Sequence, residues 1–293
     1  CIRDRVFPQY FVSKLASQHV KVVLGGEGGD EIFGGYTRYL IAYLEQCIKG
    51  GIEGTQEDPK YVVTFESILP NLRQLQGYES LLRYFWQEGL FESEDRRYFR
   101  LIDRSNSIRG LINRDFLPDK REYDPYEAYR ELFYSAGCRS LINKMTWFDM
   151  KTSLPALLQV DDRTSMAVSL ESRAPLLDHR IVELAASMPP MVKYKGGRSK
   201  YIFRQAVRHI VPPEIYNRTD KTGFPVPLSE WYRQGRVREF VKETLLGDRA
   251  RARGFIHSEQ VEILLDSERP FGRGIWGLLC LELWMQTFLD GSI

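Results

Sequence analysis

The chain has 293 residues, of which 43% are hydrophobic and 27% are charged, and its 41 basic and 39 acidic residues leave a formal net charge of only +2. This balance is typical of a soluble globular protein, and it gives no electrostatic reason to expect a nucleic acid or an anionic membrane as a partner. No apolar run approaches the roughly 18 residues that a membrane-spanning helix needs.

The cysteines and histidines are scattered along the sequence. The four cysteines include no CxxC pair, which favours a reducing, cytoplasmic location. The four histidines do not suggest a zinc site.

The first residues, CIRDRVFPQ, are too charged for a signal peptide. A first-residue cysteine is the nucleophile of some glutamine-cleaving domains, but CIRDRVFPQ supplies no oxyanion hole or pocket, so we interpret the chain as part of a longer protein.

The first predicted elements are a helix and a strand. Residues 8–19 place Phe11 and Leu15 one turn apart, which predicts an amphipathic helix. The segment VKVVL at 20–24 predicts a short buried strand. From there on, apolar residues three and four apart predict helices at 39–48, 60–69, 78–90, 93–104, 125–136, 141–150, 179–188, 200–210 and over most of 229–293.

The predicted architecture is therefore predominantly helical. Residues 49–59, KGGIEGTQEDP, predict a surface loop, and no segment has the composition of a linker, so we expect one domain over residues 1–293. We predict no second strand. Because a lone strand cannot form a sheet, and a glycine-rich loop after a strand is typical of the C-terminal edge of an open α/β sheet, further strands are expected outside this chain.

The segment GGEGGDEIFGG at residues 25–35 combines six glycines with three carboxylates. Glycine permits close approach of a ligand to the backbone, and carboxylates tolerate phosphate when a metal ion lies between them. The dinucleotide fingerprint GxGxxG fails at Glu31, and the P-loop pattern fails at Gly35 and Tyr36, where it requires lysine and serine or threonine. The alternative is a turn whose acids only cap a helix.

Three later segments narrow the interpretation: VDDRTSMAVSLESRAPLLD at 160–178, GGRSKYIFRQA at 196–206 and NRTDKTGFPVPLSEW at 217–231. Together with KVVLGGEGGDEIFGG, and in this order, they resemble the C-terminal synthetase domain of glutamine-dependent asparagine synthetases. The resemblance covers roughly residues 5–235. It implies the C-terminal portion of an α/β adenine-nucleotide-hydrolase-like synthetase domain, with most of its parallel sheet outside this chain.

Two departures from the family pattern are visible. Gly25 stands where the family usually has serine, and the pyrophosphate loop SGGxDS is absent from these 293 residues. The resemblance therefore implies that this loop and the glutaminase domain lie outside the chain. We expect the chain alone to be inactive, because half of its phosphate and metal ligands would be missing.

The resemblance implies roles for the residues of the glycine-rich segment. Leu24, Gly25 and Gly26 match positions whose backbone lies against the nucleotide. Asp30 matches an aspartate that binds Mg²⁺, although the residues alone also allow helix capping by Asp30 and Glu31.

Two further residues match catalytic positions. Glu27 matches a glutamate beside the acyl-adenylate, where a carboxylate can accept a proton from attacking ammonia. Lys200 matches a lysine that neutralises phosphate charge, although a single helical lysine is more often only solvated. The weaker substrate-pocket candidates are Asp162, Arg163, Glu171, Arg173 and Lys221. For the first four, buried ion pairs that hold the loop are an equal alternative, and Lys221 is a candidate for contact with phosphate.

The implied reaction is ATP-dependent conversion of aspartate to asparagine through β-aspartyl-AMP, with ammonia derived from glutamine and with Mg²⁺ as the metal. One alternative is a related ligase that adenylates another carboxylate, such as a β-lactam synthetase, but such enzymes typically have tyrosine where Glu27 stands. Another is a non-catalytic interaction module. The implied partners are small-molecule substrates and a glutaminase domain, and a homodimer is compatible with the sequence.

Overall fold

The computed structural model describes residues 6–53, 83, 86, 89, 91–103, 105, 108–117, 119, 123–195, 198–218, 226–268 and 272–291. The chain divides into two compact units. One comprises Cys1–His19, Asp103–Asp124 and Lys221–Ile293, and is called here the C-terminal unit; the other, the glycine-loop unit, comprises Val20–Ile102 and Pro125–Asp220.

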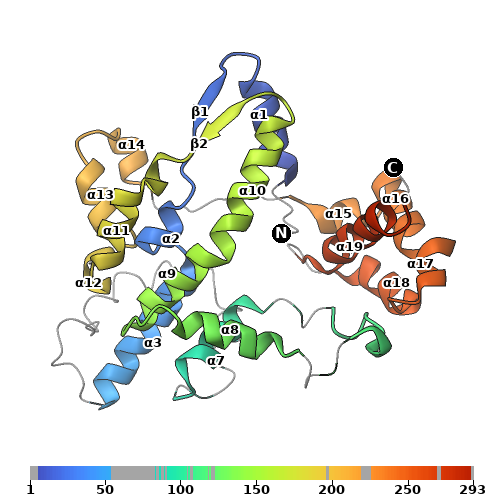
Figure 1. The fold of residues 1–293 in the computed structure, drawn as a ribbon, viewed down its shortest axis with the longest axis horizontal. Coiled ribbons are helices and arrows are strands. Elements are labelled where there is room, and N and C mark those ends of the chain that lie inside the picture. Colours follow the sequence, from blue (N-terminus) through green and yellow to red (C-terminus); the bar gives the residue numbers. More distant parts are fainter. Residues whose placement is uncertain are drawn as a thin grey trace. The chain divides into compact units, whose positions relative to one another are not determined.

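Helices predominate in both units, as the sequence predicts (Figure 1). The glycine-loop unit contains β1 (Val22–Leu24), α2 (Gly29–Phe33), α3 (Thr37–Glu53), α7 (Glu94–Ile102), α8 (Pro125–Tyr134), α9 (Leu141–Lys151), α10 (Ser153–Met166), β2 (Glu171–Arg173), α11 (His179–Ser187), α12 (Pro190–Lys193), α13 (Tyr201–Val207) and α14 (Pro213–Tyr216). The C-terminal unit contains α1 (Val6–Ala16), α15 (Leu228–Trp231), α16 (Gly235–Leu246), α17 (Asp248–Arg253), α18 (Ser258–Ser267) and α19 (Gly274–Phe288). None of the described helices is both long enough and apolar enough to cross a membrane.

The prediction of a single strand is wrong, because β1 pairs with β2 in a two-stranded parallel sheet. Val22, Val23 and Leu24 lie opposite Glu171, Ser172 and Arg173. The sequence ESR has no apolar alternation, so its own pattern cannot identify a strand; the pairing with β1 makes it one. Figure 1 shows the sheet at one end of α10, with β1 leading towards α2.

The helix predictions for the described residues are confirmed, with one boundary corrected. Part of the predicted loop at 49–59 is helical, since α3 continues to Glu53. A glycine in a helix costs only about 1 kcal/mol relative to alanine, which does not end a helix whose preceding turns are buried. Residues 54–59 and the predicted helix at 60–69 lie outside the described residues, as does most of the predicted helix at 78–90.

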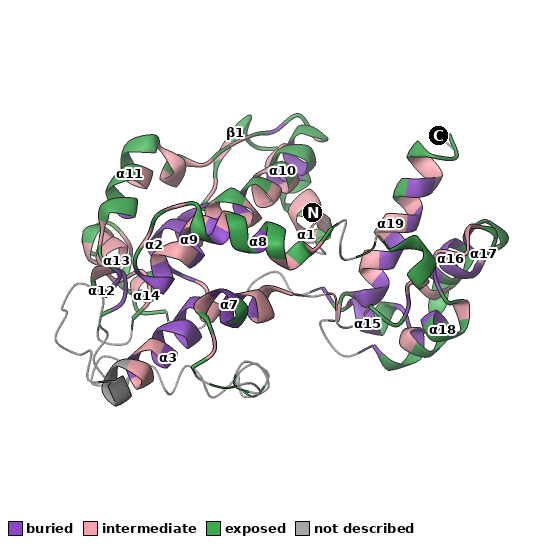
Figure 2. Cartoon of the chain, turned by 60° about the horizontal axis from the view of Figure 1, so that its bottom comes forward, coloured by how far each residue is buried: buried purple, intermediate pink, exposed green. Residues whose placement is uncertain are grey.

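The main core of the glycine-loop unit is formed by α3, α7, α8 and α9. Residues 39–44 of α3 are buried on every side, so α3 is a central rather than a surface helix (Figure 2). Aromatic rings fill the space between these helices: Tyr129 stacks on Phe133 with ring centroids 5.4 Å apart, and Phe148 meets Tyr98 edge to face at 6.0 Å.

A buried carboxylate lies in this core. Asp149 of α9 accepts hydrogen bonds from Arg38 Nη2 at 2.5 Å, from Tyr98 OH at 2.7 Å and from the hydroxyl of Tyr39. Ser153 Oγ of α10 donates to its other oxygen at 3.2 Å. Asp149 thereby connects α3, α7, α9 and α10 through a single charge.

The C-terminal unit packs around one face of α19. Ile275, Leu278, Leu279 and Met285 of this helix are buried, as the apolar sequence predicts. Glu282 on the same helix is also buried, and Arg253 Nε lies 3.1 Å from its carboxylate. The predicted N-terminal helix, α1, contributes Phe7, whose ring lies 5.3 Å from that of Trp276.

A buried lysine stands in the glycine-loop unit without a carboxylate partner among the described residues. Lys193, at the end of α12, is only 2% exposed. Burial lowers the pKa of its ammonium group from an ordinary value of 10.5 to about 8.

We expect the substitution Asp149→Asn to lower the free energy of unfolding by about 3 kcal/mol or more, because it leaves the Arg38 guanidinium uncompensated. Urea denaturation followed by circular dichroism measures this change. Glu127→Gln is the matched control: it breaks an exposed ion pair with Arg130, for which less than about 1 kcal/mol is expected. Equal effects of the two substitutions would contradict the role of Asp149.

We expect Lys193→Met to raise the free energy of unfolding at pH 7, where burial of the charged amine disfavours the folded state by about 3 kcal/mol. The folded-state pKa lies below the unfolded one, so the wild type should gain stability as the pH rises from about 8 towards 10.5. The difference in the free energy of unfolding between the wild type and Lys193→Met should therefore decrease over that pH range. Denaturation at several pH values measures it, with Lys21→Met, at an exposed position, as the control. A pH-independent difference would contradict the prediction.

Candidate functional site

The glycine-rich segment runs from the end of β1 through α2 to the start of α3. Its second glycine pair requires special geometry. Gly34 ends α2 with a φ of 73°, a left-handed conformation that favours glycine, and its carbonyl accepts a hydrogen bond from the buried hydroxyl of Tyr194. Tyr194 in turn stacks on Tyr43 of α3 with ring centroids 4.9 Å apart. The turn is therefore fixed against the core.

Asp30 and Lys200 meet beside this turn. Lys200 Nζ lies 2.8 Å from Asp30 Oδ1, and both side chains are partly exposed, at 29% and 26%. A Cβ on Gly35 would lie 1.8 Å from Asp30 Oδ1 and 2.2 Å from Lys200 Cε, so only glycine leaves room for the pair. The structure thus brings together two predicted site residues that are 170 positions apart in the sequence.

Lys200 also has an unusual backbone. It precedes α13 with φ 56° and ψ 30°, a left-handed conformation that is uncommon for a residue with a Cβ. Such conformations cost about 1–3 kcal/mol and persist where the surroundings determine them, often at functional sites. The N-cap residue of α2 is Gly28, which has no side chain, and Asp30 lies in the first turn of this helix, where its carboxylate pairs with Lys200.

Glu27 is half-buried at the first turn of the segment, and its carboxylate folds back over Gly25. A Cβ on Gly25 would lie 2.0 Å from Glu27 Oε2, so the carboxylate occupies the space that a serine at position 25 would need. Burial raises the pKa of the Glu27 carboxyl above its ordinary range, and the negative charges of Asp161 and Glu31 act in the same direction. A carboxylate with a raised pKa is a better proton acceptor near neutral pH.

Two acidic neighbours of Glu27 differ from the sequence prediction. Glu31 is buried and accepts a hydrogen bond from the Tyr36 hydroxyl, so it is a core residue rather than a helix cap. The negative charge of Asp161 in α10 acts on Glu27, and the sequence analysis missed this residue. Its only signal is the doubled aspartate in VDDRTSM, of which the family pattern has one.

The predicted nucleotide-binding residues lie at the accessible end of β1. The Gly25 amide donates to the Arg173 carbonyl at 2.8 Å, which continues the ladder to β2. Leu24 is 73% exposed, and among the described residues no atom lies within 4 Å of the place where a Cβ would stand on Gly26. A ligand can therefore approach this backbone closely.

Four of the weaker pocket candidates form ion pairs with one another. Asp162 pairs with Arg163 at 2.5 Å, and Glu171 pairs with Arg173 at 2.7 Å. All four side chains are more than half exposed. These are exposed pairs between near neighbours in the sequence, within α10 and within β2, and not the buried ion pairs of the alternative. Lys221 lies outside the described residues.

Asp30 is the predicted metal ligand, and its surroundings can be compared with what Mg²⁺ requires. The described part of the chain contains no cluster of three or more acidic, histidine or cysteine side chains that could hold a metal ion alone. One partly exposed carboxylate beside a lysine fits Mg²⁺, which usually takes one or two carboxylates together with substrate phosphates.

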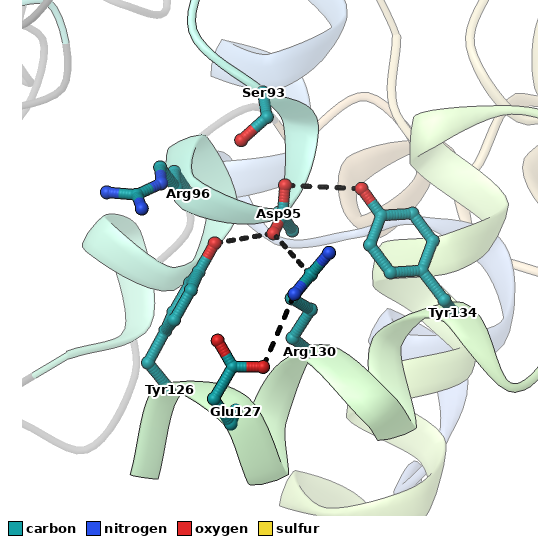
Figure 3. Close-up of a pocket in the computed structure, with 7 residues that line it drawn as sticks. All are labelled: Ser93, Asp95, Arg96, Tyr126, Glu127, Arg130 and Tyr134. Atoms are coloured by element: carbon teal, nitrogen blue, oxygen red, sulfur yellow. Dashed lines mark hydrogen bonds and ion pairs between the residues drawn. The ribbon is translucent and has the colours of Figure 1, made fainter. Parts of the chain in front are cut away.

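A polar cavity of about 360 Å³ lies elsewhere in the glycine-loop unit, between the start of α7 and α8 (Figure 3). Asp95 accepts a hydrogen bond from Tyr126 OH at 2.5 Å and one from Tyr134 OH at 3.2 Å, and Arg130 Nε lies 3.6 Å from it. Arg130 also pairs with Glu127 at 3.3 Å. Asp95, Arg130 and Glu127 thus pair with one another, and no predicted site residue lines the cavity. We therefore do not regard this cavity as the functional site.

Comparison with known proteins identifies the family of the chain. The sequence model of the asparagine synthase family matches residues 2–286. The chain is 32% identical to the glutamine-hydrolyzing asparagine synthetase 1 of Bacillus subtilis, over 94% of the chain and 42% of that protein. It is 29% identical to a putative glutamine-hydrolyzing asparagine synthetase of Mycobacterium bovis, over 98% and 42%. It is also 31% identical to the amidase chyE of Penicillium rubens, over 87% and 40%.

The chain thus spans about two fifths of the length of these curated relatives. The family match covers both units of the chain and every described residue of the glycine-rich site. The chain belongs to the asparagine synthase family.

Proposed function

We propose that the chain is part of an ATP-dependent ligase that converts the side-chain carboxylate of aspartate into the amide of asparagine. The observation that carries the proposal is the Asp30–Lys200 pair, 2.8 Å apart, next to the exposed end of β1 in a chain of the asparagine synthase family. The carboxylate attacks the α-phosphorus of ATP and pyrophosphate leaves. Ammonia, released from glutamine by a glutaminase domain, then attacks the acyl carbon of β-aspartyl-AMP and AMP leaves.

Each site residue has a role in these two steps. The backbone at Leu24, Gly25 and Gly26 lies against the nucleotide. Lys200 binds phosphate oxygens and neutralises the charge that develops as pyrophosphate leaves. Asp30 would hold Mg²⁺, which would supply positive charge to neutralise the phosphate oxygens.

Glu27 serves the second step. Its partly buried carboxylate takes a proton from the attacking ammonia, a role that its raised pKa supports. The negative charge of the ionised Glu27 carboxylate also stabilises the cationic nitrogen of the tetrahedral intermediate.

The proposal extends to the SGGxDS loop, which these 293 residues do not contain. We propose that the loop completes the phosphate and metal ligands beside Asp30 and that the chain alone does not cleave ATP. The experiments below therefore use the protein with this loop present. One relative is named as an amidase rather than as an asparagine synthetase. Assays with carboxylic acids other than aspartate therefore test which acid this site activates.

We expect Lys200→Ala to lower the rate of adenylate formation by roughly 100-fold or more, because one preorganised charge at a developing anion is typically worth about 3–4 kcal/mol. Exchange of labelled pyrophosphate into ATP in the presence of aspartate measures this step. The control is Lys21→Ala, at an exposed position of the same unit. Near-normal exchange in Lys200→Ala would make Lys200 a solvated surface residue.

We expect Glu27→Gln to separate the two steps. Pyrophosphate should still form, because Asp30 and Lys200 remain. The rate of asparagine formation should fall by roughly 100- to 10,000-fold, which is the rate enhancement that a positioned general base usually contributes. In the wild type, asparagine formation should decline as the pH falls through the raised pKa of Glu27, and the variant should lack this limb.

The measurement is a paired assay of pyrophosphate and asparagine with saturating ammonium. Glu183→Gln, at an exposed glutamate of α11, is the matched control. Wild-type asparagine output from Glu27→Gln would show that Glu27 is not the base. A parallel loss of both products would show that its carboxylate is also needed to seat the intermediate.

A further inference from the structure

The segment that carries Lys200 is strongly and uniformly basic. Between Glu183 and Glu214 the sequence contains no acidic residue. The lysines and arginines of this interval are Lys193, Lys195, Arg198, Lys200, Arg204 and Arg208. A local excess of positive charge of this kind raises the concentration of anions nearby.

Several of these cations already have an evident structural role. Lys193 is buried in the core, and Lys200 pairs with Asp30. Arg204 donates to the carbonyls of Tyr216 and Arg218 at 3.1 Å each, which connects α13 to the end of α14. The two cationic residues between Lys193 and Lys200 are Lys195 and Arg198, and among the described residues their side chains form no hydrogen bond or ion pair.

Lys195 and Arg198 lie directly opposite each other. Their backbones form an antiparallel bridge, with Lys195 N donating to Arg198 O at 3.4 Å and Arg198 N donating to Lys195 O at 3.1 Å. Side chains of residues paired in this way project from the same face, with Cβ atoms about 5 Å apart. Lys195 Nζ lies 5.7 Å from the ring centroid of Tyr201, the residue that follows Lys200, so the bridge lies near the start of α13.

Two positive charges in directly opposite positions destabilise a bridge unless an anion lies near. Both residues are exposed, and within the described part of the chain neither forms an ion pair with a carboxylate. The negative charge of Asp30, by contrast, is engaged with Lys200. The bridge is therefore a cationic surface that the described residues leave uncompensated.

We propose that Lys195 and Arg198 form a pyrophosphate clamp, a binding surface for the diphosphate group of a nucleoside triphosphate or for free pyrophosphate. This inference rests on the proposed function, because it places the clamp next to the Lys200 that acts on the phosphates. Arg198 binds phosphate oxygens through its planar, multidentate guanidinium, and Lys195 contributes a mobile point charge. The clamp adds a second contact region for the diphosphate besides Lys200 and explains why the bridge carries like charges.

The test is isothermal titration calorimetry of the protein, at low ionic strength with Mg²⁺, using inorganic pyrophosphate, ATP and AMP as separate probes. Lys195→Gln and Arg198→Gln should each weaken pyrophosphate and ATP binding about tenfold, whereas AMP affinity should change less than about twofold. Arg198→Lys should retain most of the affinity. Both glutamine variants should also lower the dependence of pyrophosphate affinity on salt concentration, as loss of a phosphate contact does.

Lys21→Gln is the matched control, and thermal unfolding by circular dichroism verifies that each variant is folded. Unchanged pyrophosphate and ATP affinities in the folded double variant Lys195→Gln/Arg198→Gln would overturn the clamp and leave the proposed function intact. A wild type that binds ATP but no measurable amount of pyrophosphate would also overturn the clamp. Clamp-dependent binding of pyrophosphate by a wild type that binds neither ATP nor AMP would support the clamp and contradict the nucleotide site at Gly25 and Gly26.

Discussion

The buried carboxylate of Asp149 is the interaction on which the glycine-loop unit depends. It receives hydrogen bonds from Arg38 and Tyr39 at the start of α3, from Tyr98 of α7 and from Ser153 of α10. A charge this deeply buried is tolerated only when several donors surround it. Because Arg38 and Tyr39 follow the second glycine pair almost directly, the same carboxylate fixes the point at which the glycine-rich segment enters the core. Its other end is fixed by the pairing of β1 with β2.

Between these two fixed ends the chain has little freedom, and this restriction positions the chemistry. Tyr194 holds the Gly34 carbonyl, and the absence of a side chain on Gly35 lets Asp30 and Lys200 meet. Lys200, the residue before α13, has a left-handed backbone, and its side chain contacts Asp30 of α2. Together these features bring one cation and one carboxylate into contact beside the glycine-rich turn.

Much of this arrangement could be predicted from the sequence, for identifiable reasons. The helices follow from apolar periodicity, and the glycine-rich segment identifies itself by composition. The meeting of Asp30 with Lys200 could be expected only through the resemblance to a family, because no local pattern relates residues 170 positions apart. β2 was missed because a three-residue polar strand exists only through its partner. Asp161 was missed because a second aspartate beside Asp162 gives no sign of which one turns inward, and the family pattern directed attention to the outward one.

The central claim is that this site activates a carboxylate by adenylation. The most direct measurement uses aspartate labelled with oxygen-18 in its side-chain carboxylate, incubated with ATP, Mg²⁺ and ammonium and with the protein that carries the chain and the SGGxDS loop. Attack of the carboxylate on the α-phosphorus leaves one of its oxygens on the phosphate when ammonia displaces AMP. Mass spectrometry should therefore find one oxygen-18 atom in the AMP that forms with asparagine. Label in inorganic phosphate, or AMP without label, would contradict the account.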